Sequence, residues 1–338
     1  MPETNRQVLL QRRPNGMPVP EDFKIVDAPL PEPKDGEVLL RGIYLSLDPY
    51  MRGRISGVRS YARPVEIGEL IEGRVVGRVV LSRDPAWREG DYAFGGYGWQ
   101  LYSAVPASSL LRLDPQEAPI STALGVLGMP GMTAYIGLAD IGQPKPGETV
   151  VVSAASGAVG AVAGQLAKRS GARVVGIAGG GEKCRYVTQE LGFDAAVDHR
   201  GGDLAAALDA ACPNGIDVYF ENVGGAVQQA IFPRFNDFGR MVMCGMISEY
   251  NDREPRPGPN LGAVVRKRLR IQGFIVGDQR HRFGEFRQMA APLVRAGQLK
   301  YREDIVAGLD RAPEAFIGLL QGRNFGKLLV RLADDPTR

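Results

Sequence analysis

The chain has 338 residues, more than a single hydrophobic core comfortably supports, so we expect two domains. Its 41 basic and 38 acidic side chains leave a net charge of +3, which gives no basis for a nucleic-acid partner. Three cysteines without a C-x-x-C pair favour a reducing compartment over a disulfide framework. No stretch reaches the roughly 18 uninterrupted apolar residues of a membrane span. We therefore expect a cytoplasmic protein that binds neither nucleic acid nor membrane.

Residues 1 to about 120 read as short β segments separated by glycine and proline. Glycines inside the apolar runs predict bulges or bends, as in a curled sheet or small barrel. No long helical period appears, so this part of the chain is predicted to be mostly β. The clearest segments are 8–11, 23–26, 36–47, 70–82 and 101–105.

From about Glu148 onward, short apolar runs alternate with segments of helix length. This alternation is typical of βαβ units, in which helices cover both faces of a parallel sheet. The tail offers the helix PEAFIGLLQGR and the strand GKLLVRL, which we expect to return to the first domain. The predicted fold class is α/β, a doubly wound parallel sheet of the Rossmann type inserted into a β domain. The expected boundaries are 124–302 for the nucleotide domain and 1–123, completed by 303–338, for the β domain.

The stretch SAASGAVG (153–160) approaches a dinucleotide-binding loop, with Ala155 in place of the first glycine of G-x-G-x-x-G. The first position tolerates a small side chain best. Gly157 permits close approach of the backbone to a pyrophosphate, and Gly160 lets helix and strand pack tightly. A helix starting near Gly157 would direct its N–H groups and dipole at the phosphates. A tight turn built only for packing is the alternative.

The end of the second strand indicates which dinucleotide is bound. An NAD site usually presents a carboxylate there for the ribose 2′-hydroxyl, whereas this strand ends in Ala178 and three glycines. Glu182 follows, but the helix dipole explains an acid in a first turn. Lys183 and Arg185 could pair with a 2′-phosphate, or could be two solvated helix residues. The pattern favours NADP.

Histidine and cysteine are absent from the β domain. A catalytic zinc normally takes three protein ligands that include His or Cys, so no metal site is expected. The two histidines, His199 and His281, lie in the later part of the chain, which also removes a Ser–His–Asp or Cys–His arrangement. The chemistry is therefore expected to come mainly from the cofactor.

Six motifs in order resemble the zinc-independent medium-chain dehydrogenases/reductases. Within that family they are most similar to the group of leukotriene B4 dehydrogenase/prostaglandin reductase, bacterial curcumin reductase and plant alkenal double-bond reductase. The resemblance implies a GroES-like β domain, a Rossmann domain, and NADPH-dependent reduction of the C=C bond of α,β-unsaturated aldehydes or ketones. The motifs are YLSLDPYMRGR (44–54), GMPGMTAYIGL (128–138), AASGAVG (154–160), ENVGG (221–225), CGMISEYN (244–251) and GRNFGKLLV (322–330).

The resemblance also implies where the cofactor lies. It places 157–160 at the pyrophosphate, Lys183 at the 2′-phosphate and Asn222 near the nicotinamide ribose. His199 stands where the family commonly has a tyrosine near the adenosine phosphate; when protonated it would attract the phosphate, and it could equally weaken selectivity for NADPH. The full set of expected cofactor residues is Gly157, Ala158, Val159, Gly160, Lys183, His199, Asn222, Cys244, Gly245, Ile247, Tyr250, Phe274, Ile275, Val276 and Asn324.

Two tyrosines are the candidates for catalysis. Hydride delivery to the β-carbon of an enone leaves charge on the carbonyl oxygen, which calls for a hydrogen-bond donor. Tyr250 follows a strand end, a crevice position in such sheets, and is the first candidate; a packing role is its alternative. Tyr50, in DPYMR, is a weaker candidate for lining the substrate pocket, because an Asp-Pro turn with a buried aromatic explains it nearly as well.

Other functions and assemblies remain open from the sequence. A quinone oxidoreductase shares the zinc-free layout and cofactor loop, and a non-catalytic NADPH-binding protein would share the loop alone. A homodimer is expected through edge pairing of RIQGFIV (270–276), although a loop could cover such an edge instead. The expected partner is a small enone or enal substrate.

Overall fold

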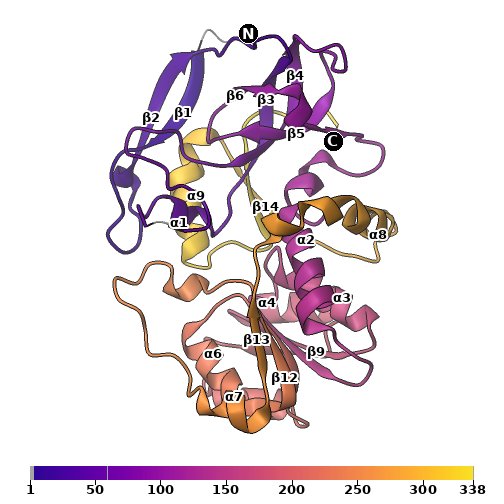
Figure 1. Ribbon diagram of the computed structural model, residues 1–338. Coiled ribbons are helices and arrows are strands. Elements are labelled where there is room, and N and C mark those ends of the chain that lie inside the picture. Colours follow the sequence, from indigo (N-terminus) through magenta and orange to yellow (C-terminus); the bar gives the residue numbers. More distant parts are fainter. Residues whose placement is uncertain (1–3, 59, 338) are drawn as a thin grey trace. The chain divides into compact units, whose positions relative to one another are not determined.

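The computed structural model describes residues 4–58 and 60–337. The chain folds into two compact units (Figure 1). Unit 1 comprises Met1–Leu124, Glu303–Asn324 and Leu328–Arg338. Unit 2 comprises Gly125–Arg302 and the short segment Phe325–Lys327. The chain therefore leaves unit 1 after Leu124, builds most of unit 2, returns at Glu303, and adds only Phe325–Lys327 to unit 2 before it ends in unit 1.

Unit 1 is a β domain. Strands β1 and β2 form an antiparallel pair, and a seven-stranded sheet has the order β14-β15-β3-β4-β5-β7, with β6 on β3. The register of β3 against β4 shifts between Gly42 and Tyr44, a bulge of the kind that glycine in this run predicts. The strands are β1 (Thr4–Leu10), β2 (Phe23–Pro29), β3 (Glu37–Ser46), β4 (Arg74–Ser82), β5 (Tyr92–Tyr97), β6 (Tyr102–Pro106), β7 (Leu111–Leu113), β14 (Glu303–Ala307) and β15 (Lys327–Arg331).

The returning tail completes the core of unit 1. Helix α9 (Ala312–Leu320) places Phe316 edge-on to Trp99, with ring centroids 5.6 Å apart. Phe23, at the start of β2, stacks on the same indole at 5.8 Å. All three rings are buried, so burial of large aromatic surface ties the last strands to the first.

The sequence analysis missed β5, β7 and the four-residue helix α1 (Met51–Arg54). Strand β5 reads YAFGGY, where two glycines interrupt the apolar alternation. Strand β7 and helix α1 are shorter than the window in which a period of 2 or 3.6 can be recognised. Their conformation is set by pairing with β5 and by the Asp-Pro turn before Met51.

Unit 2 is a doubly wound α/β domain, as expected. Its six strands are all parallel and lie in the order β10-β9-β8-β11-β12-β13. The order reverses between β8 and β11, where a crevice for ligands opens in sheets of this type. The strands are β8 (Thr149–Ser153), β9 (Arg173–Ala178), β10 (Ala195–Asp198), β11 (Ile216–Glu221), β12 (Phe235–Met243) and β13 (Arg270–Gly273).

Helices cover both faces of this sheet (Figure 1). Residues of α5, α6 and α7 share one apolar core with β8–β12, while α2 and α3 pack together on the other side. No helix within 4–58 and 60–337 is long and apolar enough to cross a membrane. The helices are α2 (Met129–Ile136), α3 (Gly160–Arg169), α4 (Gly181–Arg185), α5 (Leu204–Ala211), α6 (Gly225–Ile231), α7 (Gly262–Lys267) and α8 (Phe283–Arg295).

Candidate cofactor site

The loop between β8 and α3 forms a tight turn. Gly157 N–H donates to the carbonyl of Ala154 at 2.9 Å, and Ala154 adopts a left-handed φ of 49°. This turn delays α3, which begins at Gly160, one turn later than expected. No side chain caps the start of α3, so its first N–H groups are not taken by a capping residue.

The two glycines of the loop are required for different reasons. A Cβ on Gly160 would press into the carbonyl oxygen of Ala154 and lie 2.9 Å from its carbonyl carbon, so the fold itself needs glycine there. A Cβ on Gly157 would meet only that oxygen, at 3.1 Å. Ala155 is fully buried and donates its N–H to Ile177, which shows that the first fingerprint position accepts a methyl group here. The loop therefore leaves open backbone beside Gly157, which suits a pyrophosphate.

The turn after β9 is open and lined by cations. A Cβ on Gly180 would meet nothing within 4 Å, and one on Gly181 would meet only Arg185 Nη1 at 3.5 Å. Lys183 Nζ lies 5.9 Å from the centroid of the Phe325 ring. Open space of this kind, next to cationic side chains, fits an adenosine ribose that carries a phosphate.

Phe325 is a residue that sequence reasoning missed at this turn. Its ring packs edge-on against Tyr186 at 5.1 Å and lies 4.0 Å from the guanidinium carbon of Arg302. The motif GRNFGKLLV had drawn attention to Asn324 alone. Because Phe325 is more than 130 residues after Lys183 in the chain, no local pattern could have paired them.

His199 follows the carboxyl end of β10 and lies beside the turn after β9. Its N–H donates to the carbonyl of Ala178 at 3.0 Å. Partial burial, and then the positive charge of Arg200, lower the pKa of His199 from its ordinary 6.5. The imidazole is therefore neutral at physiological pH in the protein without a bound anion.

At the switch point between β8 and β11, a buried carboxylate organises the loops. Glu221 is fully buried, and its Oε1 accepts hydrogen bonds from Tyr219, Ser153, Val223 N and Gly224 N at 2.7–3.2 Å. Its Oε2 is buried with no hydrogen-bond partner among the described residues. Burial raises the pKa of Tyr219 well above its ordinary value, so this phenol donates as a neutral group.

Asn222 is drawn into the same network. Its side-chain amide donates to Ser153 O at 2.8 Å, and its backbone N–H donates to Ser153 Oγ at 2.9 Å. These bonds join the ends of β8 and β11, strands that are 62 or more residues apart in the chain. Sequence reasoning named Asn222 but missed Ser153 and Glu221, which hold it in place.

The loop after β12 is fastened to the loop after β11 by backbone hydrogen bonds. Cys244 and Gly245 both donate to Glu221 O, and Ile247 donates to Asn222 O at 3.2 Å. Burial, with a contribution from Glu221, raises the pKa of Cys244 to about 12, so its thiol is protonated. The structure therefore brings Asn222, Cys244, Gly245 and Ile247 into one pair of loops.

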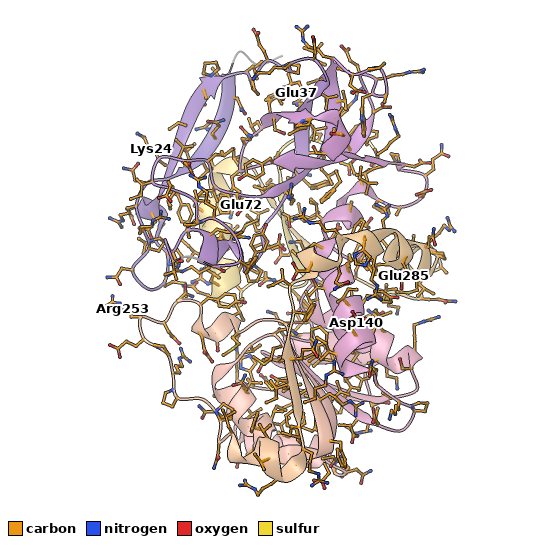
Figure 2. The ribbon with its side chains drawn as sticks, viewed as in Figure 1. Lys24, Glu37, Glu72, Asp140, Arg253 and Glu285 are labelled. Atoms are coloured by element: carbon orange, nitrogen blue, oxygen red, sulfur yellow. The ribbon has the colours of Figure 1, made fainter. Side chains whose placement is uncertain are left out.

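Tyr250 ends the short 3-10 helix Ile247–Glu249 in this loop. Its hydroxyl accepts a 3.4 Å bond from Met246 N and lies 2.8 Å from where a Cβ of Gly245 would be. The chain then continues without helix or strand through an exposed segment that carries Arg253 (Figure 2).

The remaining predicted residues lie outside the loops that follow β8, β11 and β12. Phe274, Ile275 and Val276 follow the carboxyl end of β13, on the same edge of the sheet as the loops above. Tyr50 and Asn324 belong to unit 1.

Tyr50 stands directly before α1, and burial, followed by the charge of Asp48, raises the pKa of its phenol. Arg54 lies 5.7 Å from the Tyr50 ring and forms an ion pair with Glu72 at 2.9 Å; Glu72 is labelled in Figure 2. Within 4–58 and 60–337 there is no group of three or more His, Cys, Asp or Glu placed to hold a metal ion.

The parallel sheet, the phosphate-type loop at the start of α3 and the glycine turn after β9 define unit 2 as a dinucleotide-binding domain. Family models agree: residues 6–113 match the N-terminal domain of oxidoreductase, and 158–294 match the zinc-binding dehydrogenase domain.

Similar proteins extend this agreement to nearly the whole chain. It is 50% identical to the NADPH-dependent curcumin reductase of Escherichia coli strain K12, and 41% identical to an NADP-dependent 2-alkenal reductase of Nicotiana tabacum, each over 98% of both chains. The crystal structure of CurA from Vibrio vulnificus in complex with NADPH has a TM-score of 0.93 at 47% identity, covering 98% of this chain and 100% of that one. The chain belongs to the medium-chain dehydrogenase/reductase family, in its zinc-independent group of curcumin, alkenal and prostaglandin reductases.

Proposed function

We propose that this chain reduces the C=C bond of α,β-unsaturated aldehydes or ketones with NADPH, with Tyr250 as the hydrogen-bond donor to the substrate carbonyl. Membership in the group makes the chain an NADP-dependent reductase. The specific substrate class is the proposal. One observation carries it: the loop that is fastened beside Asn222 presents a phenol, Tyr250, at the carboxyl edge of the sheet.

Different residues of unit 2 would bind different parts of the cofactor. The open backbone at Gly157, with Ala158, Val159 and Gly160 at the start of α3, would bind the pyrophosphate. Lys183 and His199 would meet the 2′-phosphate. Asn222, the loop of Cys244, Gly245 and Ile247, and residues 274–276 would surround the nicotinamide end. A cofactor contact by Asn324 stays a prediction from the sequence. When bound, NADPH supplies the hydride.

The protein's own contribution is to orient and to stabilise charge. When a hydride arrives at the β-carbon of an enone, negative charge develops on the carbonyl oxygen. A phenol donating to that oxygen lowers the barrier without transferring its proton completely. The role of Tyr50 in lining the substrate pocket stays a prediction from the sequence; burial raises the pKa of its phenol, which keeps it neutral.

The experiment is Tyr250→Phe, measured by NADPH consumption and product mass with short alkenals, long-chain enones and quinones. If Tyr250 is the sole donor, kcat for enones falls by about 100-fold or more, whereas the KM for NADPH stays nearly constant. A smaller drop would indicate that a ribose hydroxyl of the cofactor shares the role.

Tyr135→Phe is the matched control, since the Tyr135 hydroxyl bonds to Glu285 on the surface of unit 2. Full enone reduction by Tyr250→Phe would remove Tyr250 from the mechanism. Turnover of quinones but not enones by the wild type would replace the proposal with quinone reduction. Tight NADPH binding without any turnover would indicate a binding protein.

A homodimer through β13 is also proposed. This strand is the last in the sheet order, and Ile271 is 38% exposed on it. A strand at the end of a sheet order, with an exposed apolar side chain, can pair with a second copy. Light scattering after size exclusion would report the dimer mass for the wild type and the monomer mass for Ile271→Lys; a monomeric wild type contradicts the proposal. The cytoplasmic location expected from the sequence stays a prediction.

A further inference from the structure

The side chains of His199 and Arg200 fold back over the glycine turn that follows β9. A Cβ built on Gly179 would lie 2.8 Å from Arg200 Nε, 3.1 Å from its Cζ and 2.9 Å from His199 Nε2. Beside them, a Cβ on Gly180 would meet nothing within 4 Å. The Arg200 guanidinium and the neutral His199 imidazole therefore border open space at the end of the second strand.

Asp198 fixes this arrangement through the backbone. Its Oδ1 accepts hydrogen bonds from Gly180 N at 2.8 Å and Arg200 N at 2.9 Å, which joins the turns after β9 and β10. These two bonds lower the pKa of the Asp198 carboxyl, so it remains ionised. The acid serves as a clamp for the two turns.

Among residues 4–58 and 60–337, the side chain of Arg200 forms no ion pair and no hydrogen bond; only its backbone N–H donates to Asp198. Arg185 borders the same turn from α4, and the charge of Lys183 acts on His199 beside it. Three cations, Arg200, Lys183 and Arg185, stand against two acids, Glu182 and Asp198, so the side chains around 179–181 carry excess positive charge.

The geometry suits a phosphate better than a hydroxyl. A guanidinium presents a planar fork of donors that matches phosphate oxygens bidentately, whereas a ribose 2′-hydroxyl is usually recognised by a carboxylate acceptor at this strand end. Ala178 and the glycines provide no such acceptor. An Arg held over a glycine backbone therefore distinguishes the two dinucleotides.

We propose that Arg200 is a specificity-determining residue of this chain, which binds the 2′-phosphate of NADPH over the glycine turn at 179–181, together with Lys183. The inference rests on the proposed function only in taking NADPH as the cofactor. It adds to that function a residue on a third strand end, and it makes the preference for NADPH depend on the clamp formed by Asp198.

The experiment compares binding of 2′,5′-ADP and 5′-AMP, which differ by the 2′-phosphate alone, to the full chain by titration calorimetry. Arg200→Gln should weaken 2′,5′-ADP binding roughly tenfold or more and leave 5′-AMP unchanged. Arg200→Lys keeps the charge but loses the two-pronged set of donors, so its affinity for 2′,5′-ADP should lie between those of the wild type and Arg200→Gln. Arg266→Gln, an exposed arginine on α7, is the control for net charge and should leave both ligands within about twofold.

Steady-state kinetics distinguish a loss of 2′-phosphate binding from a general loss of folded protein. Arg200→Gln should raise the KM for NADPH while leaving kcat and the KM for NADH unchanged. Equal weakening of both fragments, or of neither, overturns the inference, and so does a wild type that binds 2′,5′-ADP no better than 5′-AMP. Fragment binding needs no turnover, so failure of the wild type to reduce enones would defeat the proposed function and leave this test intact.

Discussion

Alanine substitutions at the two glycines of the cofactor loop should affect different properties: stability at Gly160 and NADPH binding at Gly157. Neither Gly157 nor Gly160 has a positive φ, so alanine is conformationally allowed at both. At Gly160, the new methyl group would overlap the backbone of Ala154 and Ala155, with a Cβ 3.0 Å from Ala155 Cα. Backbone atoms cannot rotate away, so the strand and helix must separate.

Overpacking of this kind costs about 1–3 kcal/mol. For a domain of the size of unit 2, each kcal/mol lowers Tm by about 2–4 °C, so a cost in the middle of that range, about 2 kcal/mol, should lower the Tm of Gly160→Ala by roughly 4–8 °C. At Gly157, the single 3.1 Å contact with Ala154 O needs an adjustment of a few tenths of an ångström, which costs less than about 1 kcal/mol. Its methyl group would instead occupy the space proposed for the pyrophosphate.

The assay is thermal unfolding of both variants without ligand, followed by calorimetric titration with NADPH. Gly160→Ala should lose stability, and Gly157→Ala should lower Tm by less than about 4 °C while binding NADPH about tenfold more weakly. Equal Tm values for the two variants would refute the steric reasoning. Unchanged NADPH affinity in Gly157→Ala would remove this backbone from the pyrophosphate site.

Three further predictions concern the same edge of the sheet. A bound 2′-phosphate would raise the lowered pKa of His199, so NADPH binding should take up a proton and weaken as pH rises through the pKa of the bound form, with NADH binding unaffected. His199→Gln should flatten that pH profile, and a wild-type profile matching the variant would contradict the reasoning. Glu221→Gln places an amide donor where Oε2 has no hydrogen-bond partner among the described residues, so the free energy of unfolding in urea should fall by about 1–3 kcal/mol. An unchanged urea midpoint would count against a stabilising role of this buried network. Ala154→Gly relieves a left-handed φ and should change stability by less than about 1 kcal/mol, whereas Ala155→Gly, at a buried position without that strain, should lower Tm.

The sequence alone determined the fold class and the kind of cofactor loop. Short apolar runs alternating with helices can bury both faces of a sheet only if the strands are parallel, which is the arrangement in unit 2. The spacing of Gly157 and Gly160 was enough to predict a dinucleotide-binding loop, because each glycine is needed for the absence of a side chain at a fixed position. Six short motifs then identified the family.

Tertiary structure alone decided which side chains meet. Strand order brings the carboxyl ends of β8, β9, β10 and β11 to one edge, although these strands are separated in the chain by whole helices. Arg200 therefore reaches Gly179, Glu221 reaches Ser153, and Phe325 reaches Lys183. Local periodicity is blind to such pairs, because it reports which face of an element is buried and not which neighbouring strand supplies the partner.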